Sequence, residues 1–157
     1  MPPTAIEVVE IRPVGYANIL NDPKAGELFA AYSQECAIAE IGETNPQTQL
    51  YEAMETSGLM RTFGAYAGGV LVGFATVLVY VLPHYGQRVA AIESLFVAKD
   101  KRSIVGWNLM QYIEAHARLA GCKAVLYSAP AGGRLEQLLS SLRNYRRTNT
   151  VFTRSLA

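Results

Sequence analysis

One carboxylate, a short basic segment and the helix after it are the part of this sequence best suited to chemistry. Glu93 lies in an otherwise mostly apolar stretch, Val89–Val97, that predicts a strand. A loop, Ala98–Val105, follows and leads into a helix expected over about Gly106–Ala120. The basic residues of that loop are Lys99, Lys101 and Arg102. Because free backbone N–H groups and the helix dipole favour anions at a helix N-terminus, we expect a phosphate-bearing ligand laid along the strand towards an acid or base.

Composition limits what surrounds this stretch. The chain has 157 residues, of which 50% are hydrophobic and 17% are charged, so we expect one globular domain over residues 1–157. A net charge of +1 gives no support to a nucleic-acid partner. Cys36 and Cys122 form no CxxC motif, and a disulfide framework is not expected. No signal peptide is evident, and the most apolar run, Val70–Leu82, is too short for a membrane helix, so we expect a cytoplasmic protein with no membrane partner.

The segments before the central stretch predict two helices and an antiparallel meander. A helix begins at Asp22-Pro23, which suit the N-cap and first helical positions, and continues to about Glu40. The other expected elements are a strand over Ile6–Ile11, a helix over Gln47–Ser57, and strands over Arg61–Ala67, Val70–Leu82 and Val89–Val97. Gly68-Gly69 and Pro83–Gly86 provide the turns between the last three strands.

The segments after the central helix add one parallel crossover. A strand over Lys123–Ser128 follows the helix, and a strand–helix–strand unit places its strands parallel with a right-handed crossover. A helix over Arg134–Leu142 and a last strand over Thr148–Leu156 complete the chain. We therefore predict an α/β (α+β) fold with a mixed, mostly antiparallel sheet. A cleft is expected where the Val89 and Lys123 strands splay apart, a place that nucleotide-like ligands favour.

The run Ile92–Met110, IESLFVAKDKRSIVGWNLM, together with the layout, resembles the GNAT-type N-acetyltransferases. In that family the central strand carries an acidic residue before a Leu-aromatic-Val ending, as Glu93 does here. The family's Q/R-x-x-G-x-G/A loop aligns in two ways: Arg102 leads and the loop is one residue short, or Lys101 leads and Ile104 replaces the first glycine. Either alignment leaves one glycine of the motif missing.

The resemblance implies helices on both faces of the sheet and transfer of an acetyl group from acetyl-CoA to a primary amine by direct attack. It makes Glu93 the candidate general base, acting through a water, and backbone N–H groups near Leu95 the stabilisers of the thioester oxygen. The strand residues implied to hold the pantetheine arm are Leu95, Phe96 and Val97. The residues implied around the pyrophosphate are Lys101, Arg102, Ser103, Gly106, Trp107 and Asn108. The family's general-acid tyrosine has no direct counterpart, and Tyr145 is the nearest phenol.

Other interpretations of these residues remain open. Glu93 also fits a solvent-facing strand position, and Trp107 also fits the core face of its helix. A catalytically idle CoA-binding or scaffold protein agrees with the missing glycine, and a small nucleotide-binding module would prefer ATP or NAD. His84 and His116 lack ligand partners at metal-binding spacing, so no metal is expected. The amine acceptor is left unidentified, and the last strand suggests a homodimer.

Overall fold

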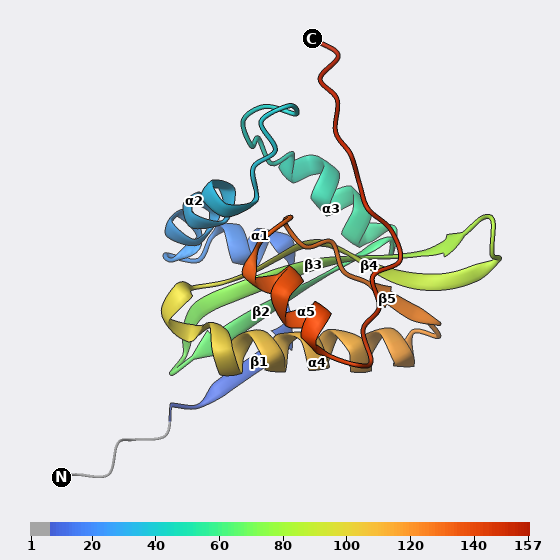
Figure 1. The fold of residues 1–157 in the computed structure, drawn as a ribbon. Helices are drawn as coiled ribbons and strands as arrows, with labels where there is room; N and C mark the ends of the chain where they lie inside the picture. The colour runs from blue at the N-terminus through green and yellow to red at the C-terminus, as the bar shows by residue number, and fades with distance from the viewer. Residues whose placement is uncertain (1–6) are drawn as a thin grey trace.

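Five strands form one sheet in the order β1-β2-β3-β4-β5, so neighbours in sequence are also neighbours in space. The computed structural model describes residues 7–157 (Figure 1). The strands are β1 (Val9–Pro13), β2 (Met60–Ala67), β3 (Val70–Leu82), β4 (Gln87–Val97) and β5 (Ala124–Leu126). The first three pairings are antiparallel and the β4–β5 pairing is parallel, which confirms the predicted meander and crossover. Ile6, where the first strand was expected to begin, lies outside the described residues.

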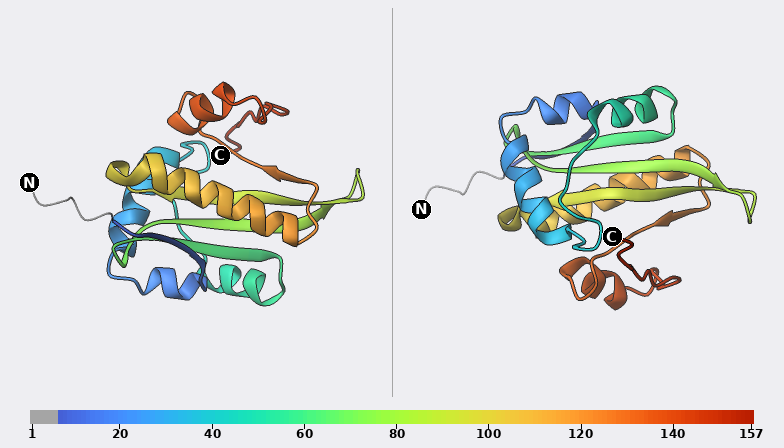
Figure 2. Two further views of the ribbon diagram at one scale, coloured as in Figure 1. Left: turned by 90° about the horizontal axis from the view of Figure 1, so that it is seen from below. Right: turned by 90° about the horizontal axis from the view of Figure 1, so that it is seen from above.

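Helices cover both faces of this sheet, as expected. Helices α1, α2 and α3 lie on one face and α4 crosses the other, while α5 lies beside β5 (Figure 2). The helices are α1 (Tyr16–Leu20), α2 (Ala25–Cys36), α3 (Thr48–Thr56), α4 (Arg102–Leu119) and α5 (Arg134–Ser141), with a short 3-10 turn, η1 (Lys99–Lys101), before α4. Helix α1, which spans little more than one turn, is not predicted from the sequence. The helix predicted from Asp22-Pro23 to Glu40 starts later, at Ala25 with Lys24 as N-cap, and ends four residues earlier, at Cys36.

Each face of the sheet has its own apolar core. On the α4 face, residues spaced by four along the helix pack against the sheet; they are Val105, Leu109, Ile113 and Ala117. On the other face, Ile19 of α1 and Leu28 of α2 meet alternate strand residues such as Phe74 and Phe96. This division follows from the helical repeat of about 3.6 residues and the strand repeat of two. The sheet therefore lies between two packed layers, which fix the positions of the strand ends.

A β-bulge interrupts β4 at Glu93. Thr76 of β3 is opposite Ser94, and Val77 is opposite Ile92, so Glu93 has no register partner. A bulged residue also changes which side chains face each side of a strand. Accordingly Ile92 joins the α4-side core before the bulge, whereas Val97 joins it after the bulge. The bulge directs Glu93 to the face of the sheet that carries α1 to α3, where its carboxylate meets Tyr51 of α3.

The β4–β5 pairing is short and ends next to this bulge. The last paired residues are Ala91 of β4 and Leu126 of β5. Strand β4 continues to Val97 and stays paired with β3, but β5 does not pair with it along residues 92–97. The strands thus separate beside Glu93, which agrees with the predicted splay.

The helix after β4 begins earlier than the sequence analysis predicted. The sequence predicts a loop up to Val105, but α4 starts at Arg102, directly after η1. Val105 explains the difference, because its side chain is 3% exposed and already belongs to the core face of the helix. Trp107, which also fitted that face, is instead 39% exposed.

The predicted last strand, Thr148–Leu156, is wrong. These residues follow α5 without forming a strand, and the chain runs out past the sheet (Figure 1). Val151, Phe152 and Leu156 are 87%, 91% and 93% exposed. Alternating β-branched residues favour a strand only where a sheet edge and a core receive them, and this segment contacts neither.

Candidate active site

The Glu93 carboxylate is held by hydroxyl groups from two elements. Tyr51 of α3 donates to Oε1 at 2.8 Å, and the hydroxyl of Thr76 donates to Oε2. Thr76 Oγ1 also lies 2.6 Å from the hydroxyl of Ser94. No cation pairs with Glu93 within residues 7–157. A carboxylate held only by neutral donors keeps its negative charge available to an incoming group.

Three tyrosines from three helices surround this carboxylate. The rings of Tyr16 and Tyr51 stack with centroids 4.1 Å apart, and Tyr32 packs edge-on against Phe96 at 5.9 Å. Burial raises the pKa of Tyr51 well above its usual range, and the hydrogen bond to Glu93 adds to that increase. Burial also raises the pKa of Tyr32 to about 12, with smaller contributions from the charges of Cys36 and Glu93. The phenols therefore stay protonated at neutral pH, and Tyr51 remains a donor to Glu93.

A second carboxylate fixes α3 in the position that brings Tyr51 to Glu93. Glu55, one helical turn after Tyr51, accepts the backbone N–H of Tyr16 at 3.0 and 3.1 Å. It also accepts the Thr62 hydroxyl at 2.5 Å. Glu55 thus ties α3 to α1 and β2. Neither Tyr51 nor Glu55 was singled out from the sequence, and the placement of Tyr51 on an amphipathic helix was the only available signal.

The free edge of β4 lies next to Glu93. Backbone groups of an antiparallel strand point alternately towards and away from the paired strand. The N–H of Ala98 bonds to Val72 O of β3 at 2.8 Å, so the groups of Leu95 and Val97 point the opposite way. Arg102 Nε donates to Val97 O at 2.9 Å, in agreement with this assignment. The N–H and C=O of Leu95 and the N–H of Val97 are thereby directed into the splay.

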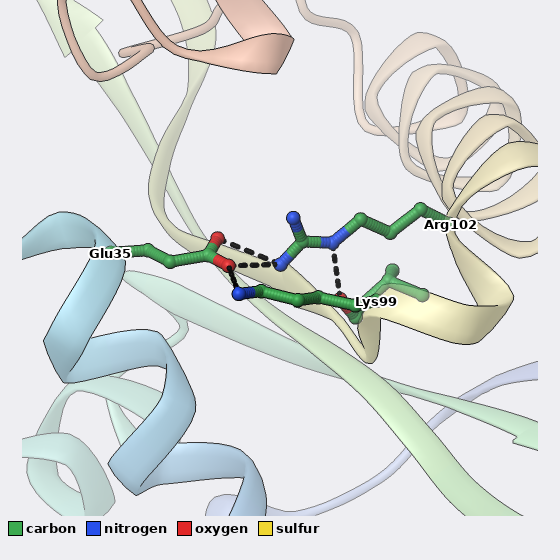
Figure 3. A network of polar contacts seen from close by, with 4 residues as sticks. Glu35, Lys99 and Arg102 are labelled. Carbon is green, nitrogen blue, oxygen red and sulfur yellow. Dashed lines mark hydrogen bonds and ion pairs between the residues drawn. The ribbon is translucent and has the colours of Figure 1, made fainter.

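The predicted basic residues Lys99, Lys101 and Arg102 lie at the start of α4. Lys101 is the N-cap and supplies no capping side chain, so the first N–H groups of α4 keep their capacity for an anion. Its ammonium lies 2.5 Å from Glu7, while Lys99 and Arg102 both face Glu35 (Figure 3). Ser103, Trp107 and Asn108 are exposed on the same helix end. A Cβ on Gly106 would contact nothing within 4 Å, so packing alone does not require glycine there.

Tyr145 lies in a different group of residues. Its hydroxyl donates to Glu114 of α4, which also accepts the Tyr127 hydroxyl at 3.0 Å. The rings of Tyr127 and Tyr145 are 5.9 Å apart. Burial raises the pKa of Tyr145 to about 12, and its hydrogen bond to Glu114 acts in the same direction. The structure thus gives Tyr145 a hydrogen-bonding partner, and its role as general acid stays a prediction.

The two histidines are apart from these groups. The ring of His116 packs edge-on against Phe63 with centroids 5.1 Å apart, and His84 packs edge-on against Tyr85 in the turn before β4. In the part of the chain that the structure describes, no group of three or more His, Cys, Asp or Glu side chains is placed to hold a metal ion. Over the same part, no helix is both long and apolar enough to cross a membrane.

A bulged carboxylate, a free strand edge and a helix N-terminus without a side-chain cap follow one another along the chain from the point where two parallel strands separate. The model of the acetyltransferase (GNAT) family matches residues 28–134, which include all three features. The chain belongs to the GNAT acetyltransferase family. None of the curated proteins matches this sequence significantly.

Solved structures of other GNAT acetyltransferases share this fold at low sequence identity. An aminoglycoside acetyltransferase from an uncultured soil metagenomic sample, in complex with trehalose, has a TM-score of 0.72 and 16% identity, over 95% of this chain and 97% of its own. A ribosomal-protein-alanine N-acetyltransferase from Brucella melitensis biovar Abortus 2308 has a TM-score of 0.69 and 19% identity, over 94% and 99%. AAC(6′)-Iy in complex with the bisubstrate analogue CoA-S-monomethyl-acetylneamine has a TM-score of 0.68 and 16% identity, over 96% and 99%. The agreement covers nearly the whole of each chain and supports the GNAT fold throughout.

Proposed function

We propose that this GNAT chain is an N-acetyltransferase that moves an acetyl group from acetyl-CoA to a primary amine by direct attack. The observation that carries the proposal is the position of Glu93. It lies at a bulge, at the point where β4 loses β5, with its carboxylate held by neutral donors only. An acceptor amine and a donor laid along the free edge of β4 would meet at this point.

Glu93 would serve as the general base. An alkylammonium with a pKa near 10.4 must lose a proton before it can attack a thioester. Glu93 would take that proton, directly or through a water, while Tyr51 and Thr76 hold the carboxylate in place. The N–H of Leu95, which points into the splay, is suited to stabilise negative charge on the acyl oxygen.

The free edge of β4 and the start of α4 fit the two ends of acetyl-CoA. The donor supplies the activated acetyl thioester. The C=O of Leu95 and the N–H of Val97 would pair with the amides of the pantetheine arm as with an added strand. The N–H groups at residues 102–104, together with the side chains of Lys101 and Arg102, would hold the pyrophosphate. Ser103, Trp107 and Asn108 lie exposed beside them, and Phe96 contributes through its backbone.

A catalytically idle CoA-binding protein is the second candidate, and the start of α4 favours it. Ile104 stands where one alignment of the family motif has its first glycine, and its side chain is 66% exposed. A branched side chain at that position restricts the approach of a ligand to the backbone. Such a protein would bind acetyl-CoA and transfer nothing.

Binding and turnover together test these alternatives. Acetyl-CoA, CoA, ATP and NAD should be compared in a thermal-shift experiment, because a ligand that binds only the folded state stabilises it. We expect acetyl-CoA and CoA alone to raise the melting temperature. An acceptor screen that measures free thiol should follow, with an aminoglycoside, a peptide that has an N-terminal alanine, a lysine peptide and a small diamine. Thiol release with any amine supports the enzyme, binding without release supports the idle protein, and stabilisation by ATP or NAD instead refutes both.

A further inference from the structure

The last turn of α2 delivers a carboxylate to the basic residues at the start of α4. Both oxygens of Glu35 lie 2.7 Å from Arg102 Nη2, and Lys99 Nζ lies 3.7 Å from Oε1 (Figure 3). Glu35 and Arg102 are 67 residues apart in sequence. Arg102, which is expected to receive a phosphate group, and the nearby Lys99 are therefore already facing an anion that belongs to the chain.

Arg102 is also held at two other points, so its guanidinium has a fixed orientation. Nε donates to Val97 O at 2.9 Å, and Cζ lies 5.2 Å from the centre of the Phe96 ring. A guanidinium recognises a phosphate through paired N–H groups, and Nη2 is one of the two outer nitrogens able to form such a pair. Glu35 thus occupies one of the two outer nitrogens through which Arg102 would hold a phosphate at this helix end.

We propose that Glu35 is a built-in competitor for the donor's pyrophosphate and thereby sets the affinity for acetyl-CoA. This inference rests on the proposed function, because it assigns a role within the same donor site. A carboxylate and a phosphate carry charge of the same sign and cannot share Arg102 Nη2 and Lys99 without repulsion. Donor binding therefore displaces Glu35. In the free protein, Glu35 neutralises cations that would otherwise attract other anions.

The exposure of this ion pair separates the proposed role from a merely structural one. The side chains of Arg102 and Glu35 are 20% and 32% exposed, and that of Lys99 is 78% exposed. A partly exposed pair contributes modestly to folding because solvent screens it in part and ordering long side chains costs entropy. Removing the charge of Glu35 should therefore change donor affinity more than it changes thermal stability.

Isothermal titration of three proteins tests the proposal: the wild type, Glu35→Gln and the matched control Glu27→Gln. Glu27 is on the same helix and pairs with Lys24 at 3.3 Å, away from α4. We expect Glu35→Gln to bind acetyl-CoA about 2- to 5-fold more tightly at low salt, the range that removal of such a partly exposed pair allows. Glu27→Gln should match the wild type. S-acetylpantetheine, which lacks the pyrophosphate, should bind equally to all three.

Unchanged or weaker binding of acetyl-CoA by Glu35→Gln overturns the proposal, as does an equal gain for S-acetylpantetheine. If Glu35→Gln does not fold, Glu35→Asp tests the same point, since its shorter side chain should loosen the contact and tighten acetyl-CoA binding to a smaller extent. Inorganic pyrophosphate separates the two levels of the argument. If the wild type binds acetyl-CoA and Glu35→Gln binds it no more tightly, the role of Glu35 is refuted and the proposed function stands. A wild type that binds neither acetyl-CoA nor pyrophosphate refutes both.

Discussion

Replacing Glu93 by glutamine would remove the proposed base while keeping the shape of the side chain. The amide retains one acceptor oxygen, so either Tyr51 or Thr76 loses its acceptor. Thr76 has an alternative partner in Ser94, whose hydroxyl is 2.6 Å away. The lost charge-assisted hydrogen bond should therefore cost only about 1–2 kcal/mol of folding free energy. The Glu93→Gln protein should fold, so a change in rate can be attributed to chemistry.

The expected effect on turnover is much larger than the effect on stability. Removing a positioned general base lowers the rate by roughly 10²- to 10⁴-fold. Affinity for acetyl-CoA should stay within about 2-fold, because the donor is expected to contact the edge of β4 at Leu95 and Val97 rather than the Glu93 carboxylate.

The assay is thiol release under saturating acetyl-CoA, with the dissociation constant measured separately. Without a base, the variant depends on amine that is already deprotonated in solution. That fraction rises about tenfold per pH unit below the amine pKa. The Glu93→Gln rate should therefore rise with pH more steeply than the wild-type rate. Glu52→Gln is the matched control, because Glu52 is an exposed carboxylate on α3 beside Tyr51.

Two results would refute this reasoning. A Glu93→Gln protein with wild-type turnover at every pH would mean that Glu93 takes no proton. A parallel loss of turnover and acetyl-CoA affinity would mean that Glu93 holds the donor or the fold instead of serving as a base.

Two further predictions concern the scaffold. Gly73→Ala should lower the free energy of unfolding by about 1–3 kcal/mol, because the added Cβ would lie 2.8 Å from the backbone oxygen of Phe96. The control Gly26→Ala, with nothing within 4 Å of its Cβ, should be neutral or stabilising by up to about 1 kcal/mol. Equal melting temperatures for the two variants would contradict the packing argument. Tyr32 has a folded-state pKa raised to about 12 from 10.0, so its contribution to stability is full below pH 10 and is lost as the pH rises towards 12. Urea unfolding of Tyr32→Phe should show a shallower alkaline decline than the wild type, by at most about 1.4 kcal/mol per pH unit, whereas the exposed Tyr85→Phe should follow the wild type.

Local signals in the sequence were sufficient for most of the sheet and for the central helix. The turn at Gly68-Gly69, where both residues have positive φ, defines the β2–β3 hairpin, and apolar periodicity identifies β3 and α4. The start of α4 is the boundary that differs most at the site, because the sequence analysis places it at about Gly106 and the helix begins at Arg102. Val105 belongs to the core spacing of α4, and counting back from it would have extended the helix towards Arg102.

The partners of the candidate site residues were beyond sequence reasoning because they come from distant elements. Tyr51 and Glu93 are 42 residues apart, and no local pattern relates them. Glu35 was one unremarked carboxylate on an amphipathic helix until the packing of α2 placed it against Arg102. The failure of the predicted strand at Thr148–Leu156 has the same origin. Alternation of apolar and polar residues shows that a segment is able to form a strand, but it does not show whether a free sheet edge lies beside that segment.

The bulge at Glu93 has a consequence for how the chain tolerates a change of length. Ile92 and Val97 both reach the α4-side core although they are five residues apart, an odd number that regular alternation does not permit. Deleting Glu93 would leave an even separation, and the remaining strand residues would keep their faces and their partners on β3. The sheet is therefore complete without Glu93. Strand β4 carries one residue more than its pairing with β3 requires, and that additional residue is the carboxylate at the point where the pairing with β5 ends.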